Sequence, residues 1–381
     1  MKKKIRWKKL LFQIVIFLIG GLVGFVSFSH LKHLLFGKNI LYLIPVLFVM
    51  GLAVFLQIIV HEAGHLLFGI LTGYHFSSFR ILSFMWMKEE GRIRLKRMSI
   101  AGTGGQCLLD PPDMKDGKIP VILYNFGGVL LNLFTSIAAI GLYFVFRSSL
   151  LGASFFMMFF IFGFAFALTN GIPIHTDLLD NDGYNGISLS KNKEAMHAFW
   201  VQMKVNENLS KGIRLKDLPE QWFEFPTVEQ MKNSMICAIG VFACNRLMDQ
   251  RRFEEAEEKM SLMMESDIAL NGIYRSLMMC DRMYIEMISD NNQTLIGKMK
   301  TKELEQFMKS MKNFPSIIRT QYMCALFCEQ DEKKAEIFKE KFEKTGKKYP
   351  YKSEVQSERE LMEMGYEIYK KKGNEDTYIW G

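Results

Sequence analysis

The pentapeptide His61-Glu62-Ala63-Gly64-His65 carries the clearest chemical signal in the chain. On a helix, residues four apart share a face, so both imidazoles can reach one metal ion, typically Zn²⁺. Glu62, one position along, can then approach water at the metal. The motif predicts a hydrolytic zinc site with His61 and His65 as ligands and Glu62 as the catalytic base.

This motif lies in an apolar stretch, residues 39–79, in which Glu62 is the only charged residue. A carboxylate and two imidazoles in a lipid-embedded segment cost several kcal/mol unless they are paired or ligated. An ionisable group at such a place therefore indicates a functional site. The alternative is a polar cluster that packing between helices satisfies.

Four stretches are long and apolar enough to cross a bilayer, which takes about 20 helical residues. They are Leu10–Leu31, residues 39–79, and the segments on either side of Arg147, which lie between Lys118 and Asp177. The first stretch is too long for a typical cleaved signal peptide and has no A-x-A site after it, so a retained anchor is favoured. We expect a mainly α-helical membrane protein with four transmembrane helices and an N-terminal anchor span, residues 1–38.

The charge distribution predicts how these spans are oriented. Residues 1–187 hold 17 Lys+Arg against 9 Asp+Glu and so carry the whole net charge of +8, while the remainder is balanced. The basic residues at the start of the chain and in the loop 80–118 favour the cytoplasm by the positive-inside rule. The pattern predicts a multi-pass protein of the cell membrane with both termini cytoplasmic. It points to a lipid bilayer as partner and not to nucleic acid, and it does not fit a soluble enzyme, a disordered chain or a fibrous protein.

A second polar segment, residues 170–183, follows the last apolar stretch and is the richest source of oxygen ligands near a membrane boundary. An HExxH in one span, followed about a hundred residues later by Asn-x-x-Pro and then Asp-Gly, resembles the site-2 protease family of intramembrane zinc metalloproteases. The resemblance implies a three-span core, placed at residues 39–187. It also implies His61 and His65 as zinc ligands, Glu62 as general base, the Asp of the Asp-Gly pair as third ligand, and Asn170 as a contact to the substrate backbone.

The spacing of the third ligand departs from the commonest form of the family, because eight residues separate Pro173 from Asp182. Asp177 lies closest to the usual position, and Asp180 is a further alternative. Only Asp182 is followed by a glycine, Gly183, which would let the backbone turn sharply and aim the carboxylate at the metal. Asp182 is therefore the predicted third ligand.

The loop and the third span carry weaker signals. Phe79–Met87 and Arg92–Ile100, rich in aromatic and branched residues, predict a small β-hairpin in the cytosolic loop. The third span opens with Gly127, Gly128 and, four residues later, Asn132, a pattern that favours close helix packing. It also resembles the middle core span of the family.

The carboxyl-terminal half, residues 188–381, predicts a cytosolic all-α domain, because amphipathic segments such as Phe253–Met260 alternate with short polar breaks. Paired helices there resemble tetratricopeptide-like hairpins without meeting the repeat consensus. A helical-repeat solenoid and an irregular bundle both stay open, and a protein partner could bind this domain.

These signals together predict an intramembrane zinc metalloprotease that hydrolyses transmembrane or membrane-associated peptides near the cytoplasmic face. One alternative is a catalytically silent membrane scaffold whose helical domain recruits partners. An intact Glu62 argues against it, since a silent protein has no need of the base. A second alternative is a membrane zinc enzyme with a non-peptide substrate.

Overall fold

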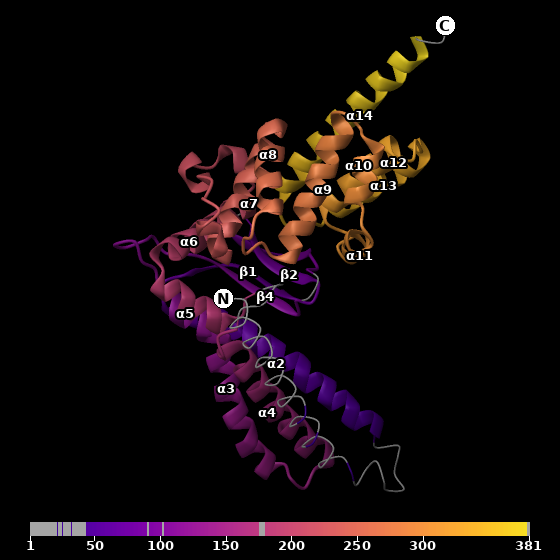
Figure 1. Ribbon diagram of the computed structural model, residues 1–381. Helices are drawn as coiled ribbons and strands as arrows, with labels where there is room; N and C mark the ends of the chain where they lie inside the picture. Colours follow the sequence, from indigo (N-terminus) through magenta and orange to yellow (C-terminus); the bar gives the residue numbers. More distant parts are fainter. Residues whose placement is uncertain are drawn as a thin grey trace. The chain divides into compact units, whose positions relative to one another are not determined.

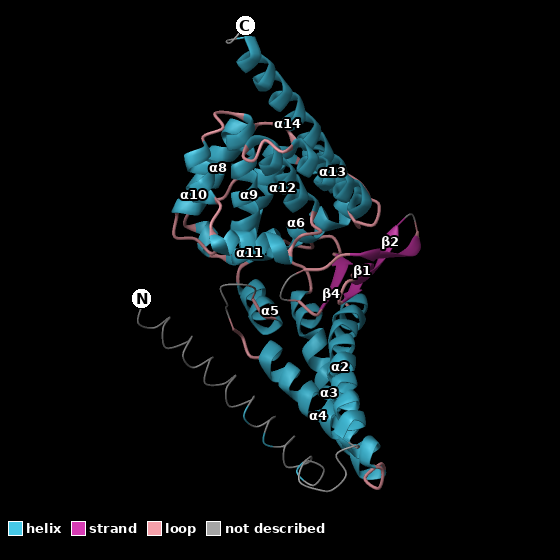
Figure 2. Ribbon diagram, turned by 90° about the vertical axis from the view of Figure 1, so that its right-hand side faces the viewer, coloured by secondary structure: helices cyan, strands magenta, loops and turns pink. Residues whose placement is uncertain are grey.

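The computed structural model describes residues 43–378 with gaps at 90, 101–102 and 175–179, together with the isolated positions 21, 25 and 32; from 373 to 378 it describes the helix but not the side chains. The described chain is mostly helical and forms two compact units (Figures 1 and 2). The first contains the described residues up to His75, Gly104–Cys107 and Pro120–Asn192. The second contains Phe76–Thr103, Leu108–Ile119 and the residues from Lys193 onward. The predicted domain boundaries at residues 38 and 187 stay a prediction.

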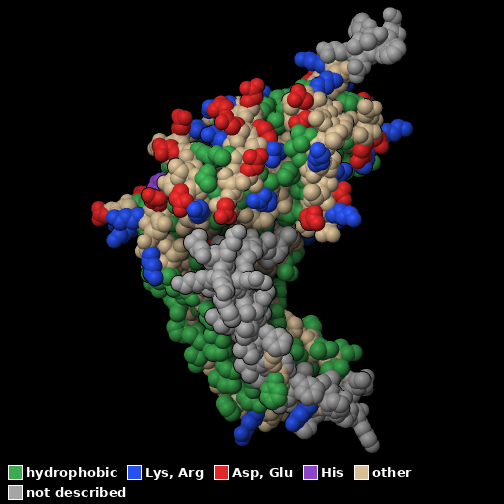
Figure 3. Space-filling view, viewed as in Figure 1, with side chains coloured by type: hydrophobic (Ala, Val, Ile, Leu, Met, Phe, Trp, Pro, Cys, Tyr) green, Lys and Arg blue, Asp and Glu red, His purple; other side chains and the backbone are tan. Residues whose placement is uncertain are grey.

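Three helices of the first unit are long and apolar enough to cross a membrane: α2 (Leu43–Leu71), α3 (Val121–Val145) and α4 (Leu150–Gly171). Even α4, with 22 residues, extends about 33 Å at 1.5 Å per residue, which exceeds a hydrocarbon core of about 30 Å. Each of the three packs against the other two, and hydrophobic side chains dominate the visible surface of these helices in Figure 3. Three of the four expected spans are thus present as suitable helices. The predicted anchor, Leu10–Leu31, lies outside the described residues apart from positions 21 and 25.

Local sequence sets the ends of these helices. Pro120, which has no N–H to donate, directly precedes α3. The hydroxyl oxygen of Ser149 accepts a hydrogen bond from the Gly152 N–H (3.2 Å) and caps the start of α4. This helix ends two residues before Pro173, which restricts the backbone ahead of it. The short link between α3 and α4 contains Arg147, the charged residue that separates the two apolar segments in the sequence.

The second predicted span is shorter than expected. Helix α2 ends at Leu71, and Gly73 takes a left-handed conformation (φ 92°) that no other residue type adopts easily. After this turn, the residues from His75 to Ile81 form strand β1 in place of further helix.

A four-stranded sheet fills the loop between α2 and α3. Its strands are β1 (His75–Ile81), β2 (Phe84–Glu89), β3 (Arg92–Arg97) and β4 (Gly105–Asp110), in the order β3-β2-β1-β4, and β2 pairs antiparallel with both β1 and β3. The predicted hairpin is present as β2 and β3. Its expected first strand, Phe79–Met87, is broken at Leu82, which has a left-handed φ of 54° and turns the chain between β1 and β2. Strand β4 has no counterpart in the prediction.

From Lys193 onward the described chain is helical, as the sequence predicts, and many methionines lie in the core of these helices. The helices are α6 (Lys193–Ser210), α7 (Ser234–Asp249), α8 (Phe253–Glu265), α9 (Gly272–Ile288), α10 (Gln293–Met299), α11 (Lys302–Ser310), α12 (Pro315–Phe327), α13 (Glu332–Gly346) and α14 (Lys352–Tyr378). Neighbours in sequence pack as pairs, α7 with α8 and α12 with α13. The likeness to tetratricopeptide repeats stays a prediction.

Candidate metal centre

The two histidines of the motif lie on one face of α2, one helical turn apart. His65 is buried, and the ring centroids of His61 and His65 are 4.9 Å apart. Their Nε2 atoms lie 3.3 Å from each other. The helical geometry that the sequence predicts for this segment thus turns both imidazoles toward one point.

Glycines bring α3 close enough to hold these rings. A Cβ added at Gly64 of α2 would lie 2.3 Å from the carbonyl oxygen of Gly127 on α3, so the two backbones touch. A Cβ at Gly128 would lie 2.6 Å from Cε1 of His61, so the imidazole lies directly against this glycine. Small residues therefore let the helices approach, as is usual within membranes, and here they also make room for the His61 ring.

Hydrogen bonds to the other ring nitrogens set the direction of both imidazoles. Nδ1 of His65 lies 2.8 Å from the carbonyl oxygen of Tyr124, and Nδ1 of His61 lies 2.7 Å from Oδ1 of Asn132. Oxygen acceptors at these positions require each Nδ1 to carry the proton. The lone pair of each neutral ring is then on Nε2, the nitrogen that faces the other histidine and Asp182. Partners of this kind accompany nearly all metal-binding histidines.

Asp182 is brought to the histidines by a short helix, α5 (Asp182–Lys191), which starts after the end of α4. Asn181 holds that start in place. Its Nδ2 donates to the carbonyl oxygens of Thr169 (2.8 Å) and Ile172 (2.6 Å), and its Oδ1 accepts from the Tyr184 N–H (3.0 Å) as the helix cap. The end of α4 and the start of α5 are therefore tied together through one side chain.

The sharp backbone turn predicted at Gly183 is not found. Gly183 is a helical residue and is not among the positive-φ glycines of the described chain, so it makes no sharp turn. A Cβ there would lie 2.2 Å from the carbonyl oxygen of Gly171. The glycine is needed because α5 packs directly against the last residues of α4, which places the neighbouring Asp182.

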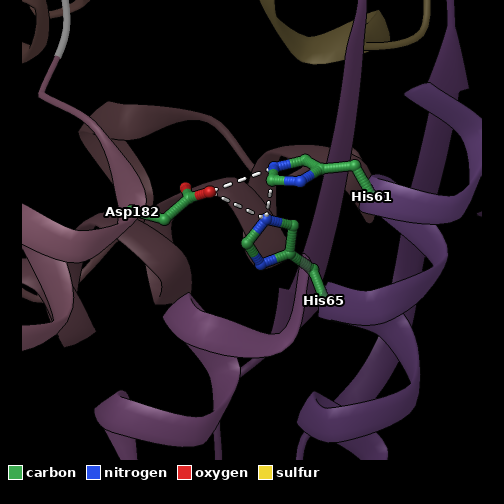
Figure 4. A group of neighbouring side chains, drawn as sticks. All are labelled: His61, His65 and Asp182. Carbon is green, nitrogen blue, oxygen red and sulfur yellow. Dashed lines mark hydrogen bonds and ion pairs between the residues drawn. The ribbon is translucent and has the colours of Figure 1, made fainter. Parts of the chain in front are cut away.

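His61, His65 and Asp182 converge as Figure 4 shows. Oδ2 of Asp182 lies 3.0 Å from Nε2 of His61 and 3.4 Å from Nε2 of His65. Donor atoms around a tetrahedral ion with bonds of about 2.0–2.1 Å are separated by about 3.3–3.4 Å, so the three spacings fit such an ion. Among the residues that the structure describes, Oδ2 of Asp182 also has no hydrogen-bond donor, although the atom is buried. Three converging lone pairs repel one another unless a cation or a proton lies among them, so this cluster could hold a metal ion.

The electrostatics favour a charged Asp182. Burial by itself would raise the pKa of its carboxyl, but imidazoles that carry a proton on Nε2, as they can when no cation lies between them, outweigh this effect and lower the pKa well below its usual range. The carboxylate is thus in the form that binds a cation.

Glu62 is buried, and it is not one of the three converging groups. Its carboxylate lies against the start of β4, where a Cβ at Gly105 would lie 2.6 Å from Oε1 of Glu62. Burial and, next, the charge of Glu62 raise the pKa of the Cys107 thiol, which places this cysteine nearby as well. Gly105, the first residue of β4, therefore allows the backbone of this strand to lie directly beside Glu62.

The other candidates that the structure describes are not part of the cluster. Asn170 is in the last turn of α4, and its Nδ2 donates to the carbonyl oxygen of Phe166 (3.0 Å). Asp180 is described but does not join the three converging groups. Asp177 lies outside the described residues.

Sequence reasoning missed two residues that build the site. Asn132 was interpreted as a packing residue, although a buried amide in a span opposite a histidine could have been considered as its partner. Asn181 had no signal beyond its place before Asp182, where it acts as a helix cap.

No protein-family model, no curated protein and no solved structure matches this chain. The resemblance to site-2 proteases therefore depends on the sequence motifs, and the function is argued from the geometry of the site.

Proposed function

We propose that this chain is an intramembrane zinc metalloprotease that cuts membrane-embedded or membrane-associated peptides near the cytoplasmic face. The observation that carries the proposal is the convergence of His61 Nε2, His65 Nε2 and Asp182 Oδ2, with spacings of 3.0 to 3.4 Å, from segments far apart in the sequence. A random polar cluster has no reason to present three electron pairs to one point.

The donor set fits a catalytic zinc ion. Two imidazole nitrogens and one carboxylate oxygen fill three of four tetrahedral positions, and catalytic zinc sites leave the fourth open. A bound Zn²⁺ ion would lower the pKa of a water molecule and polarise a peptide carbonyl. His61 and His65 would hold it through Nε2, and Asp182 through Oδ2.

Glu62 is the proposed general base. It would take a proton from the attacking water on its carboxylate and pass it to the leaving amine. Its carboxylate is buried and lies beside Gly105 at the start of β4. Asn170, in the last turn of α4, is proposed to contact the backbone of the substrate.

The position of the site along the spans supports cleavage near one face. His61 and His65 lie in the second half of α2, and Asp182 follows the end of α4, so the three groups lie toward the same end of these two helices. The basic loop residues 80–118 connect at that end and favour the cytoplasm. Both termini are proposed to be cytoplasmic.

The proposal is tested with Glu62→Gln, which keeps the shape of the side chain and removes the base. Membrane peptides are compared by mass spectrometry in cells that carry wild type, Glu62→Gln or Glu258→Gln, the last an exposed control on α8. A substrate should accumulate uncut with Glu62→Gln alone, and zinc should stay bound in all three purified proteins, because Glu62 is not a ligand.

Other outcomes would favour the alternatives. Bound zinc with identical peptides in all three cell lines would contradict proteolysis and favour a zinc enzyme with a non-peptide substrate. The absence of zinc from every purified protein would favour a membrane scaffold.

A further inference from the structure

Four polar side chains are fully buried in the three-helix bundle: Gln57 on α2, Asn132 and Ser136 on α3, and Ser154 on α4. Polar groups in an apolar bundle cost free energy unless they are hydrogen-bonded. Gln57 and Asn132 bond to each other, and Asn132 bonds to His61. They form a chain of hydrogen bonds, the amide relay, that leads from the carbonyl group of Phe159 on α4 through Gln57 and Asn132 to His61.

The direction of every bond in the amide relay follows from its first acceptor. The carbonyl oxygen of Phe159 can only accept, so the group of Gln57 that lies 2.8 Å from it must be the NH₂. Oε1 of Gln57 therefore points the other way and accepts from Nδ2 of Asn132 (2.6 Å). The backbone carbonyl of Gln57 accepts from the same Nδ2 (3.1 Å). Both contacts leave Oδ1 of Asn132 facing His61.

The two histidines differ in the group that bonds to their Nδ1 atom. Nδ1 of His65 bonds to a backbone carbonyl, which cannot reverse its polarity. Nδ1 of His61 bonds to a side-chain amide, whose oxygen and NH₂ can exchange places by a rotation of 180°. A reversed Asn132 would donate to Nδ1 of His61, move the ring proton to Nε2 and aim it at Asp182.

We infer that Gln57 is a positioning residue: its side-chain Oε1, the shorter of the two acceptors that hold Nδ2 of Asn132 (2.6 Å against 3.1 Å for the Gln57 backbone carbonyl), secures the amide orientation of Asn132. It thereby keeps the Nε2 lone pair of His61 directed at the metal. This inference depends on the proposed zinc site and extends it by one residue. Gln57 acts through Asn132 and does not touch the site itself.

The packing around Gln57 is built for this bond. A Cβ added at Gly163 of α4 would lie 2.3 Å from Nε2 of Gln57 and 2.1 Å from the hydroxyl of Ser136. Glycine at this position therefore leaves the space in which the amide of Gln57 reaches the α4 backbone. The relay thus draws on all three helices and links their packing to the tautomer of one ligand.

The test is the zinc affinity of the full-length protein in detergent, measured by competition with a chromogenic chelator, for wild type, Gln57→Leu, Asn132→Leu and the double variant. Thr135→Val is the matched control, because the Thr135 hydroxyl bonds only to carbonyls of its own helix. We expect Gln57→Leu to weaken zinc binding about 10- to 100-fold, as loss of a ligand's partner usually does. Thr135→Val should stay within about twofold of wild type, since it leaves the relay intact. The visible spectrum of the Co²⁺-substituted protein should change with Gln57→Leu and not with Thr135→Val.

The double variant separates positioning from general damage. If Gln57 acts through Asn132, the double variant binds zinc no more weakly than Asn132→Leu alone. Independent, additive losses would overturn the inference, and so would a Gln57→Leu affinity equal to that of wild type. If wild type itself binds no zinc, both the proposed function and this inference fail.

Discussion

The two units of this protein bury polar groups in opposite ways. Inside α2, α3 and α4 the buried hydrogen-bonding groups away from the metal centre are neutral amides and hydroxyls, such as Gln57 and Asn132. Among the helices of the second unit, α6 to α14, which we call the helical unit, they include charged pairs, such as Arg214 with Asp249.

Arg319 on α12 shows the second pattern best, because it is only 1% exposed. Its guanidinium contacts the carboxylates of Asp281 and of Glu358 (3.1 Å) and lies over the ring of Tyr284, 4.8 Å from the centroid. Removal of one member of such a group leaves an uncompensated charge in the core.

Amide hydrogen bonds and buried ion pairs thus serve different purposes in the two units. A neutral amide has a donor end and an acceptor end, so a chain of amides transmits orientation, and it requires no counter-charge in an apolar bundle. A buried ion pair has strong mutual attraction but a large desolvation cost. We therefore expect substitutions in the bundle to change ligand geometry, and substitutions of buried charges in the helical unit to change stability.

The largest expected effect is the loss of zinc from the metal centre, where neutral imidazoles and a charged carboxylate lie together. Asp182→Ala removes the one carboxylate that the described residues bring to the cluster, and zinc bound to the purified protein should fall from about one ion per chain to near zero. Asp180→Ala, two residues earlier, should retain the metal, which elemental analysis can measure. Retention of zinc by Asp182→Ala, or its loss with Asp180→Ala, would show that the wrong carboxylate has been assigned.

The next effect concerns the charged core. Arg319→Met should lower the free energy of unfolding of the helical unit by about 3–5 kcal/mol, because Asp281 and Glu358 lose their counter-charge. The matched control is Lys232→Met, whose partner Glu229 is 81% exposed; an exposed pair contributes at most about 1 kcal/mol. Denaturant unfolding followed by tryptophan fluorescence gives both values. Equal effects of the two substitutions would remove the distinction between the units.

The smallest effect is a dependence of stability on pH. Burial raises the pKa of Glu354 on α14 to about 7, although the Tyr349 hydroxyl donates to it (3.1 Å). The folded protein therefore binds this proton more tightly than the unfolded chain, whose glutamate has a pKa of 4.5. Stability falls as the pH rises from 4.5 to 7, and the penalty is complete above pH 7.

Glu354→Gln should remove this penalty. At pH 8 the variant should be more stable than wild type by about 3 kcal/mol, and at pH 4.5 the two should be nearly equal. Thermal unfolding at both pH values measures the difference. A constant difference at both values would mean that ionisation of Glu354 is not its cause.

Much of the fold could be predicted because it depends on local patterns. Uninterrupted apolar stretches predicted the helices α2, α3 and α4, and the period of the HExxH motif predicted two imidazoles on one face. The hairpin of β2 and β3 was predicted from its aromatic and branched residues. The break at Leu82 and the strand β4 were missed, since turn geometry and long-range strand pairing leave weaker local signals.

Residue types and spacing are enough to identify the side chains that could do chemistry. His61 and His65 are one turn apart on any helix, and an unpaired Glu62 carboxylate costs free energy in any apolar span. The carboxylate that lies beside the two histidines is known only from the tertiary structure, because its position depends on Asn181 and on the close packing of α5 against α4. Only the tertiary structure, too, joined Gln57 to His61 through another helix. A hydrogen bond has a direction in space, and a direction between helices is set by their packing and not by the spacing of residues along either one.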